Sequence, residues 1–199
     1  MNDSRTLILD RVRDALTGTD RAPAHVPREY RHKPVRPGLL DLFVERVEDY
    51  RASVHRCGPG EVTATLAAVL RNRAAVVPEG FEWDVPNPVP GLDLTAAALD
   101  KVPAVVTTAT LGVATTGTLV LTHGPGQGPR AFSLVPDVHV CVLAAERVVL
   151  GVPDAIATLD PRRPQTWISG PSATSDIELD RVEGVHGPRE LHVVVVEGP

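Results

Sequence analysis

The chain has 199 residues and a formal net charge of −5 at pH 7, with 43% hydrophobic and 4% aromatic residues. This length suits one domain, or one domain with an extension, and the apolar content is sufficient for a buried core. The acidic balance and the scarcity of aromatic side chains argue against nucleic acid as a partner. No apolar run approaches the roughly 20 residues of a membrane-spanning helix, and the first residues lack a signal-peptide core, so we expect a cytoplasmic protein with no membrane partner.

The two cysteines, Cys57 and Cys141, lie far apart and belong to no Cys-x-x-Cys pair. Iron–sulfur clusters and structural zinc sites need several thiolates brought together. We therefore expect no metal or cofactor bound through the cysteines of this chain. Reduced thiols are the expected state, with a structural disulfide as the alternative.

Residues 1–38 differ from the rest of the chain. Ile8, Val12 and Leu16 fall at helical spacing after Ser4, a plausible N-cap, and a proline-rich stretch follows. Eight basic and five acidic residues give this segment a charge of +3, against −8 for the remainder. We expect two parts: residues 1–38 as an N-terminal helix and proline-rich basic arm, and residues 39–199 as an α/β domain. The arm is either a solvated tail or an element that docks on an acidic surface.

Predicted helices and strands alternate in the remaining residues. Helices are expected over residues 39–56, 61–72, 93–101 and 153–159. Strands are expected over residues 74–77, 105–108, 118–122, 138–143, 147–150, 166–168 and 191–196. Several of these strands are apolar on both faces, as in a sheet covered by helices. The pattern predicts an α/β fold, a layered Rossmann-like domain with an open mixed sheet.

The first candidate functional segment is rich in threonine and runs from Thr107 to Thr122. Threonine favours strands, so a β-hairpin is one reading. The other reading rests on Thr116, Gly117 and Thr118, because glycine allows close backbone approach and hydroxyls donate to a carboxylate or phosphate. Farther on, Gly124, Gly126 and Gly128 are spaced as in a dinucleotide-binding loop, but Pro129 replaces the last glycine and no helix follows, so we expect a plain loop.

The second segment contains Arg130, Ser133 and His139. Arg130 follows a glycine- and proline-rich loop, where a guanidinium can grip an oxyanion with two hydrogen bonds or pair with a surface carboxylate. His139 begins an apolar run. A histidine there is more often a hydrogen-bonded structural residue than a catalyst.

Two further segments complete the candidate set. Gly170, Ser172 and Thr174 follow a predicted strand, where α/β sheets place ligand sites, and their amides and hydroxyls suit an anion. Asp176 and Glu178 can order that loop, cap a helix or hold a divalent ion; we favour capping and predict no metal. His186 lies between glycines in a tight turn, available for proton transfer or for the turn alone.

In this order, the motifs GVATTGTLVL, RAFSLVPDVHVCVL, SGPSATSDIE and GVHGP resemble the LUD domain, and specifically the lactate-utilization protein C (YkgG-like) family. The resemblance covers residues 40–199 and is densest over 104–196. It implies a fold related to the ribose-5-phosphate isomerase, glucosamine-phosphate isomerase and CoA-transferase group. It also implies a role in oxidising L-lactate to pyruvate beside iron–sulfur partner proteins, which would carry the clusters for which this chain lacks ligands.

The family pattern is met at several positions besides the anion-binding candidates Thr116, Gly117, Thr118, Arg130, Ser133, Gly170, Ser172, Asp176 and Glu178. These further positions are Gly112, Pro136, His139, His186 and Gly187. The chain departs from the pattern at Thr115, where the resemblance implies an acidic residue. A threonine there needs a separate base to become a nucleophile, which argues against a covalent CoA-transferase-like step.

Three functions are open at this point. The first is a non-redox component of lactate utilization that binds a small carboxylate or a phosphate-bearing ligand, with His186 or His139 as candidate acid or base. The second is a stand-alone enzyme on phosphorylated or CoA-linked small molecules. The third is a scaffold subunit without a ligand, and a homo-oligomer is compatible with each of the three.

Overall fold

The computed structural model describes residues 2–20, 22–27, 37–92, 94–174, 182–183 and 187–198. Its contacts divide the chain into two compact units, residues 1–30 and 31–199. The expected boundary between residues 38 and 39 stays a prediction. Thr174 is described by its backbone alone, and Asp176, Glu178 and His186 lie outside the described residues.

Among its described residues, the first unit contains one helix, α1 (Asn2–Ala15). Ser4 lies within the helix and not at its start, so the expected N-cap is wrong by about one turn. Apolar side chains of α1 are exposed, with Ile8 at 60% and Val12 at 49%. Residues 23–27 adopt no regular structure, in keeping with their prolines.

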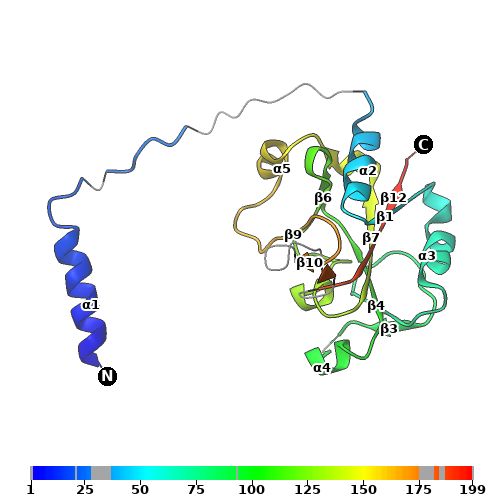
Figure 1. Cartoon of the computed structure of the whole chain (residues 1–199), viewed down its shortest axis with the longest axis horizontal. Helices are drawn as coiled ribbons and strands as arrows, with labels where there is room; N and C mark the ends of the chain where they lie inside the picture. Colours follow the sequence, from blue (N-terminus) through cyan, green and yellow to red (C-terminus); the bar gives the residue numbers. More distant parts are fainter. Residues whose placement is uncertain are drawn as a thin grey trace. The chain divides into compact units, whose positions relative to one another are not determined.

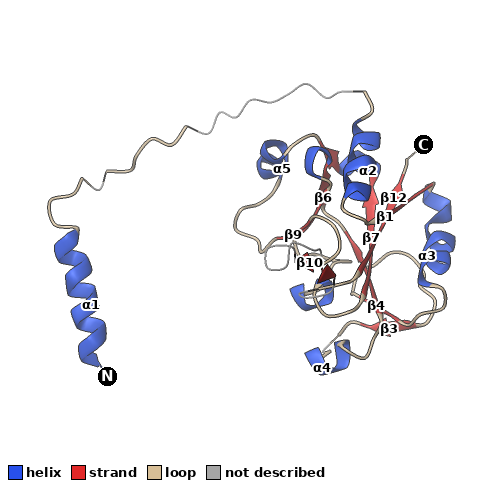
Figure 2. Cartoon of the chain, in the orientation of Figure 1, coloured by secondary structure: helices blue, strands red, loops and turns tan. Residues whose placement is uncertain are grey.

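The second unit is built on a six-stranded sheet in the order β1-β12-β7-β4-β2-β3, in which every neighbouring pair is parallel (Figures 1 and 2). The strands are β1 (Ser53–Cys57), β2 (Ala75–Val77), β3 (Pro88–Pro90), β4 (Ala104–Thr108), β7 (Val138–Ala144) and β12 (Glu190–Val196). Because all the pairs are parallel, the carboxyl ends of these strands share one edge of the sheet.

A second, smaller sheet has the order β8-β5-β6-β9 and mixes strand directions. Its strands are β5 (Leu111–Val113), β6 (Thr118–Leu121), β8 (Val148–Val149) and β9 (Thr166–Ile168). β5 and β6 form the threonine-rich hairpin, joined by the 3-10 turn η2 (Ala114–Thr116). β10 (Ala173–Thr174) and β11 (Val182–Glu183) form a separate, two-stranded antiparallel sheet.

Both faces of the large sheet are covered, which explains why its strands are apolar on both sides. On one face, α2 (Leu39–Asp49) and the small sheet bury Phe43, Val47 and Leu119 against β7 and β12. On the other face, α3 (Val62–Leu70) buries Leu66 and Leu70. Full burial of such a side chain contributes about 1.5–3 kcal/mol. The layered Rossmann-like α/β prediction is confirmed; the mixed strand directions are confined to the second sheet.

The remaining helices and turns sit at the ends of strands. They are α4 (Ala96–Leu99), α5 (Val152–Thr158) and the 3-10 turns η1 (Pro59–Glu61), η3 (Arg130–Ser133) and η4 (Ala145–Arg147). α5 packs on the outer face of the small sheet, where Ala155 meets Leu111 and Val120. None of the described helices is long and apolar enough to cross a membrane.

One predicted element is wrong. The helix expected over residues 39–56 ends at Asp49, and Ser53–Cys57 forms strand β1 instead. Arg51 takes a left-handed conformation, with φ of 65°, which stops the helix. The helical spacing of the apolar residues assigns Val54 to this helix. In the structure Val54 lies on β1 and packs against the same apolar cluster as Phe43 and Val47.

Candidate functional site

Two adjoining cavities open at the carboxyl edge of the large sheet, with volumes of about 770 and 500 Å³. The first lies beyond β2 and β3 and includes Pro78 and Gly91. The second lies at the ends of β4, β7 and β12 and includes Thr108, Ala144 and Val196. They share Gly80, Gly124, Pro125 and Arg163, and we call them together the carboxyl-edge cavity. Parallel α/β sheets place ligands at this edge, and the size suits a metabolite or cofactor.

The loop of residues 122–128 forms one wall of the cavity and is fastened through its backbone. The Gly126 amide donates to the Glu79 carbonyl at 2.7 Å, and the Thr108 amide donates to the Gly126 carbonyl at 2.8 Å. Gly126 has a φ of 73°, and a Cβ there would lie 3.0 Å from Thr108 Oγ1. Gly128, with φ of 67°, packs on Phe132 in the same way, so Gly126 and Gly128 serve tight turns and close packing in a loop.

Polar side chains tie the same loop to the segment that follows β4. The Gln127 side chain accepts from the Thr122 amide at 2.7 Å and donates to Thr110 Oγ1 at 2.9 Å. Thr110 and Thr122 hydroxyls are 2.9 Å apart. These groups satisfy one another and leave the Thr108 hydroxyl without a hydrogen bond among the described residues. The network holds the wall in place before any ligand arrives.

His123 lies at the rim of the cavity in a left-handed conformation, with φ of 55°. Its Nδ1 donates to the Gly128 carbonyl at 2.9 Å, because a carbonyl only accepts. In the neutral ring, Nε2 is then the acceptor and takes a hydrogen bond from Thr166 Oγ1 at 2.9 Å. Both ring nitrogens are occupied, so His123 fixes the loop and is not poised to move a proton.

Two guanidiniums carry positive charge into the cavity. Arg163 lines both compartments and Arg147 lines the one at the ends of β7 and β12. Across the described part of the chain, neither forms an ion pair, although Glu79, Glu82 and Glu146 line the same space. A free guanidinium beside hydroxyls and carboxylates suits a ligand with one carboxylate and one hydroxyl: the arginine takes the carboxylate in a bidentate contact, and a threonine or glutamate oxygen takes the hydroxyl.

The LUD domain profile matches residues 93–196, which include the glycine loop, Arg147 and Arg163. Lactate utilization protein C of Deinococcus radiodurans is 42% identical over an alignment of 175 residues, and the match covers 81% of this chain and 81% of that protein. The chain belongs to the LUD domain family. Lactate utilization protein C of Geobacillus sp. strain WCH70 is 31% identical over an alignment of 99 residues, and the match covers 46% of this chain and 41% of that protein. A crystal structure of a DUF162 family protein from Deinococcus radiodurans has a TM-score of 0.64 and 35% identity, and the match covers 79% of this chain and 96% of that one.

The predicted site residues of this LUD domain fall into two neighbourhoods. In the first, the Thr118 hydroxyl is 2.8 Å from that of Thr116 and 2.7 Å from that of Ser169. Gly117, with φ of 57°, lies so close to α2 that a Cβ would be 2.6 Å from the Arg46 carbonyl carbon. Gly170, with φ of 89°, approaches Tyr50 equally closely. These glycines let the hairpin turn and the β9 end pack on the end of α2.

The second neighbourhood lies beside the starts of β7 and β12, and its η3 turn also reaches the carboxyl-edge cavity, because Phe132 and the preceding Pro129 line that cavity. The Ser172 amide donates to the Pro188 carbonyl at 2.8 Å, and a Cβ on Gly187 would lie 3.4 Å from Ser172 Cβ and 3.8 Å from the Ser133 carbonyl oxygen. Ser133 is buried and donates to the Arg130 carbonyl at 3.0 Å. The Arg130 side chain itself is exposed, and among the described residues it contacts no carboxylate.

His139 is buried in the middle of the large sheet, 1% exposed, with Nε2 2.8 Å from Thr107 Oγ1. Burial lowers its pKa to about 4, so the ring is neutral at pH 7. Burial also raises the pKa of the adjacent Cys141 thiol to about 12. This environment favours the structural reading of His139 and keeps the ring away from any solvent-borne substrate.

Arg147 and Arg163 are the functional candidates that the sequence patterns do not reveal. Arg147 sits in η4 and Arg163 in an irregular loop, and neither belongs to a motif of fixed spacing. Only the parallel order of the sheet brings these two positions to the ends of the strands. Both cysteines are free and buried, as expected.

Proposed function

We propose that this protein is a non-redox component of L-lactate utilization that binds a small anionic metabolite in the carboxyl-edge cavity. The family membership and the name of the Deinococcus radiodurans relative support the pathway. The single observation that supports binding is the guanidinium of Arg163, which faces both compartments without a carboxylate partner among the described residues. A 2-hydroxy or 2-oxo acid presents the carboxylate that this group prefers.

The test uses two adjacent arginines. Arg163→Gln removes the charge from the cavity, whereas Arg162→Gln removes the same charge from an exposed neighbour that lines neither compartment. Nuclear magnetic resonance titration of the purified protein with L-lactate and with pyruvate measures the affinity. We expect Arg163→Gln to weaken binding by about tenfold or more and Arg162→Gln to leave it unchanged. Equal affinities in the two variants would place the ligand elsewhere.

We also propose that iron–sulfur proteins act beside this chain, because oxidation of L-lactate to pyruvate releases two electrons that need a redox centre. The two cysteines are buried singly, which leaves the electrons to a partner. Affinity purification from lactate-grown cells should recover proteins with iron–sulfur absorbance. Proton exchange or isomerisation of a phosphorylated or CoA-linked small molecule by the purified chain alone would instead favour the stand-alone enzyme.

A second location for the anion is the neighbourhood of Arg130 and Ser172. The proximity of Ser133, Ser172 and Gly187 favours it, since three distant segments meet there. Arg130→Ala, compared with Arg163→Gln in the same titration, separates the two locations. Loss of binding in Arg130→Ala alone would assign the ligand to the neighbourhood of Arg130 and Ser172.

A further inference from the structure

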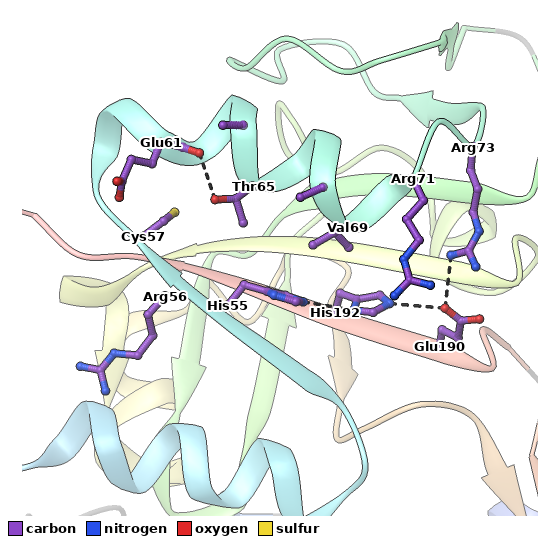
Figure 3. A pocket seen from close by; sticks show the side chains of 12 residues that line it. His55, Arg56, Cys57, Glu61, Thr65, Val69, Arg71, Arg73, Glu190 and His192 are labelled. Atoms are coloured by element: carbon purple, nitrogen blue, oxygen red, sulfur yellow. Dashed lines mark hydrogen bonds and ion pairs between the residues drawn. The ribbon is translucent and has the colours of Figure 1, made fainter.

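A third cavity of about 610 Å³ lies on the other side of the domain, between α3 and the strands β1 and β12. We call it the α3 groove. Its polar lining includes His55 from β1, Glu190 and His192 from β12, and Arg71 and Arg73 from the segment that ends α3 (Figure 3). It shares no lining residue with the carboxyl-edge cavity.

Side chains of β1 and β12 form a row of hydrogen bonds in which each donor and acceptor can be assigned. His55 Nε2 is 3.2 Å from His192 Nδ1, and His192 Nε2 is 3.4 Å from Glu190 Oε2. Arg73 also contacts Glu190 Oε2, at 3.3 Å. Because an ionised carboxylate only accepts, His192 Nε2 carries the proton, His192 Nδ1 is the acceptor, and His55 Nε2 is the donor. The free end of the row is therefore His55 Nδ1, which can take up a proton.

The carboxylates near the row are already engaged. Glu190 is paired with Arg73, and Glu61 accepts from the Gly58 amide at 2.8 Å. Arg56 points away from the histidines (Figure 3) and contacts Asp41 at 2.6 Å and Glu197 at 2.7 Å. The Arg71 amide donates to the Ala67 carbonyl, but its guanidinium, alone among these arginines, has neither a hydrogen bond nor an ion pair with any described residue. The groove thus has one unmatched guanidinium and an imidazole pair that can gain a positive charge.

The backbone at Arg71 adds an independent observation. Arg71 ends α3 with φ of 48°, in the left-handed region where glycine is the usual residue. The conformation costs stability for an arginine and directs its side chain from the helix end toward the strands (Figure 3). A side chain kept in such a position without a protein partner is a candidate for ligand contact.

We propose that the α3 groove binds the phosphate group of a small metabolite, held by Arg71 and the His55–His192 pair, and that the pair takes up a proton as the anion binds. The remaining volume, over Ala64, Ala68 and Val69, accommodates an apolar or neutral part of the ligand. A divalent cation is disfavoured, because the guanidinium repels it and the described residues provide no third ligand beside the two imidazoles.

The proton uptake follows from the surroundings of the histidines. Burial lowers the pKa of His55, and the neighbouring His192 lowers it further, so the neutral form of His55 is favoured at pH 7. The titratable and charged groups that line the groove with the pair are Cys57 on β1, Glu61 at the end of η1, Arg71 and Arg73 after α3, and Glu190 on β12. Arg56 on β1 also lines it but points away from the histidines (Figure 3). A bound dianion adds two negative charges beside the row and favours the imidazolium, so the complex holds more protons than the free protein.

The experiment measures binding of sulfate, a tetrahedral dianion that does not titrate near neutral pH, by calorimetry of the full chain in two buffers of different ionisation enthalpy. The difference between the buffers gives the protons taken up per sulfate. We expect uptake of a fraction of a proton at pH 7, tighter binding at pH 6 than at pH 8, and no uptake in His55→Gln. Binding without proton uptake in the wild-type chain would overturn the role of the pair.

Arg71→Gly is the second variant, because glycine suits the left-handed position and the fold is retained. Arg51→Gly makes the same change at the left-handed arginine after α2, which does not line the groove. We expect Arg71→Gly to weaken inorganic phosphate by about tenfold or more and Arg51→Gly to leave it unchanged. Equal binding by the two variants, equal affinity for acetate and phosphate, or Zn²⁺ bound by both histidines in place of the anion would each reject the proposal.

Discussion

At the scale of single residues, the buried His139 makes stability depend on pH. Its pKa is about 4 in the folded protein and ~6.5 in an unfolded chain, so between these values the unfolded state binds more protons. The free energy of unfolding therefore falls as the pH drops from 6.5 to 4, by up to about 3 kcal/mol from this group. Urea unfolding at pH 7, 5.5 and 4.5 measures the slope. His139→Gln should flatten it, and an unchanged slope in that variant would contradict the assignment.

The hydroxyl that bonds this histidine can be removed with little change of shape. Thr107→Val leaves a buried polar nitrogen of His139 without its 2.8 Å partner, and we expect a loss of about 1–3 kcal/mol in the free energy of unfolding. Thr63→Val, on the exposed side of α3, is the control. Equal urea midpoints for the two variants would show that the contact between Thr107 and His139 makes no net contribution to the free energy of unfolding.

Gly117 offers a similarly direct test of packing. A Cβ there would lie 2.6 Å from the Arg46 carbonyl carbon and oxygen, both backbone atoms that cannot move aside cheaply. Gly117→Ala should therefore lower the free energy of unfolding by about 1–3 kcal/mol, since it combines a clash with an unfavourable positive φ. Gly60→Ala, where a Cβ meets nothing within 4 Å, is the matched control and should leave thermal stability close to wild type. A neutral Gly117→Ala would mean that the hairpin turn shifts away from α2.

At the scale of elements, position in the sheet predicts the order of amide exchange. β7 and β12 are central, and Val140, Val142, Val193 and Val194 are at most 2% exposed. β3, by contrast, is a three-residue edge strand with a proline at each end. Hydrogen exchange should be slowest in β7 and β12 and fast in β3. Faster exchange in β12 than in β3 would contradict this order.

The elements also show what a sequence of this kind predicts well. Strands such as β7 and β9 are apolar runs bounded by turn residues, so local pattern suffices for them. β1 was not predicted, because Val54 continues the helical spacing of α2 and only pairing with β12 makes the segment a strand. β3 was not predicted, because a proline at each end is unusual for a strand. The candidate cavity could not be predicted, because it depends on strand order, which no local pattern encodes. The contact between His55 and His192 depends on strand order in the same way, since β1 and β12 are far apart in the sequence.

At the scale of the whole molecule, the buried apolar clusters draw all their members from residue 39 onward. The unit of residues 31–199 should therefore keep its stability without the first unit. A chain that lacks residues 1–30 should melt at the temperature of the full chain, as measured by calorimetry. A second truncation, which lacks residues 1–38, removes the whole basic arm, including Arg31, Lys33 and Arg36. If this chain loses its iron–sulfur partners in affinity purification, the basic arm is a docking element; retention of those partners would make it a passive tail. A lower melting temperature would contradict the division into two units.

The wall of residues 122–128 has a practical consequence for crystallography. The amides of Thr122, Gly126 and Gln127 and the side chain of Gln127 are already engaged within the protein, so a molecule that enters the carboxyl-edge cavity meets a surface that need not rearrange. Crystals grown without additives should therefore accept candidate acids by soaking, and they should do so without cracking or change of cell dimensions.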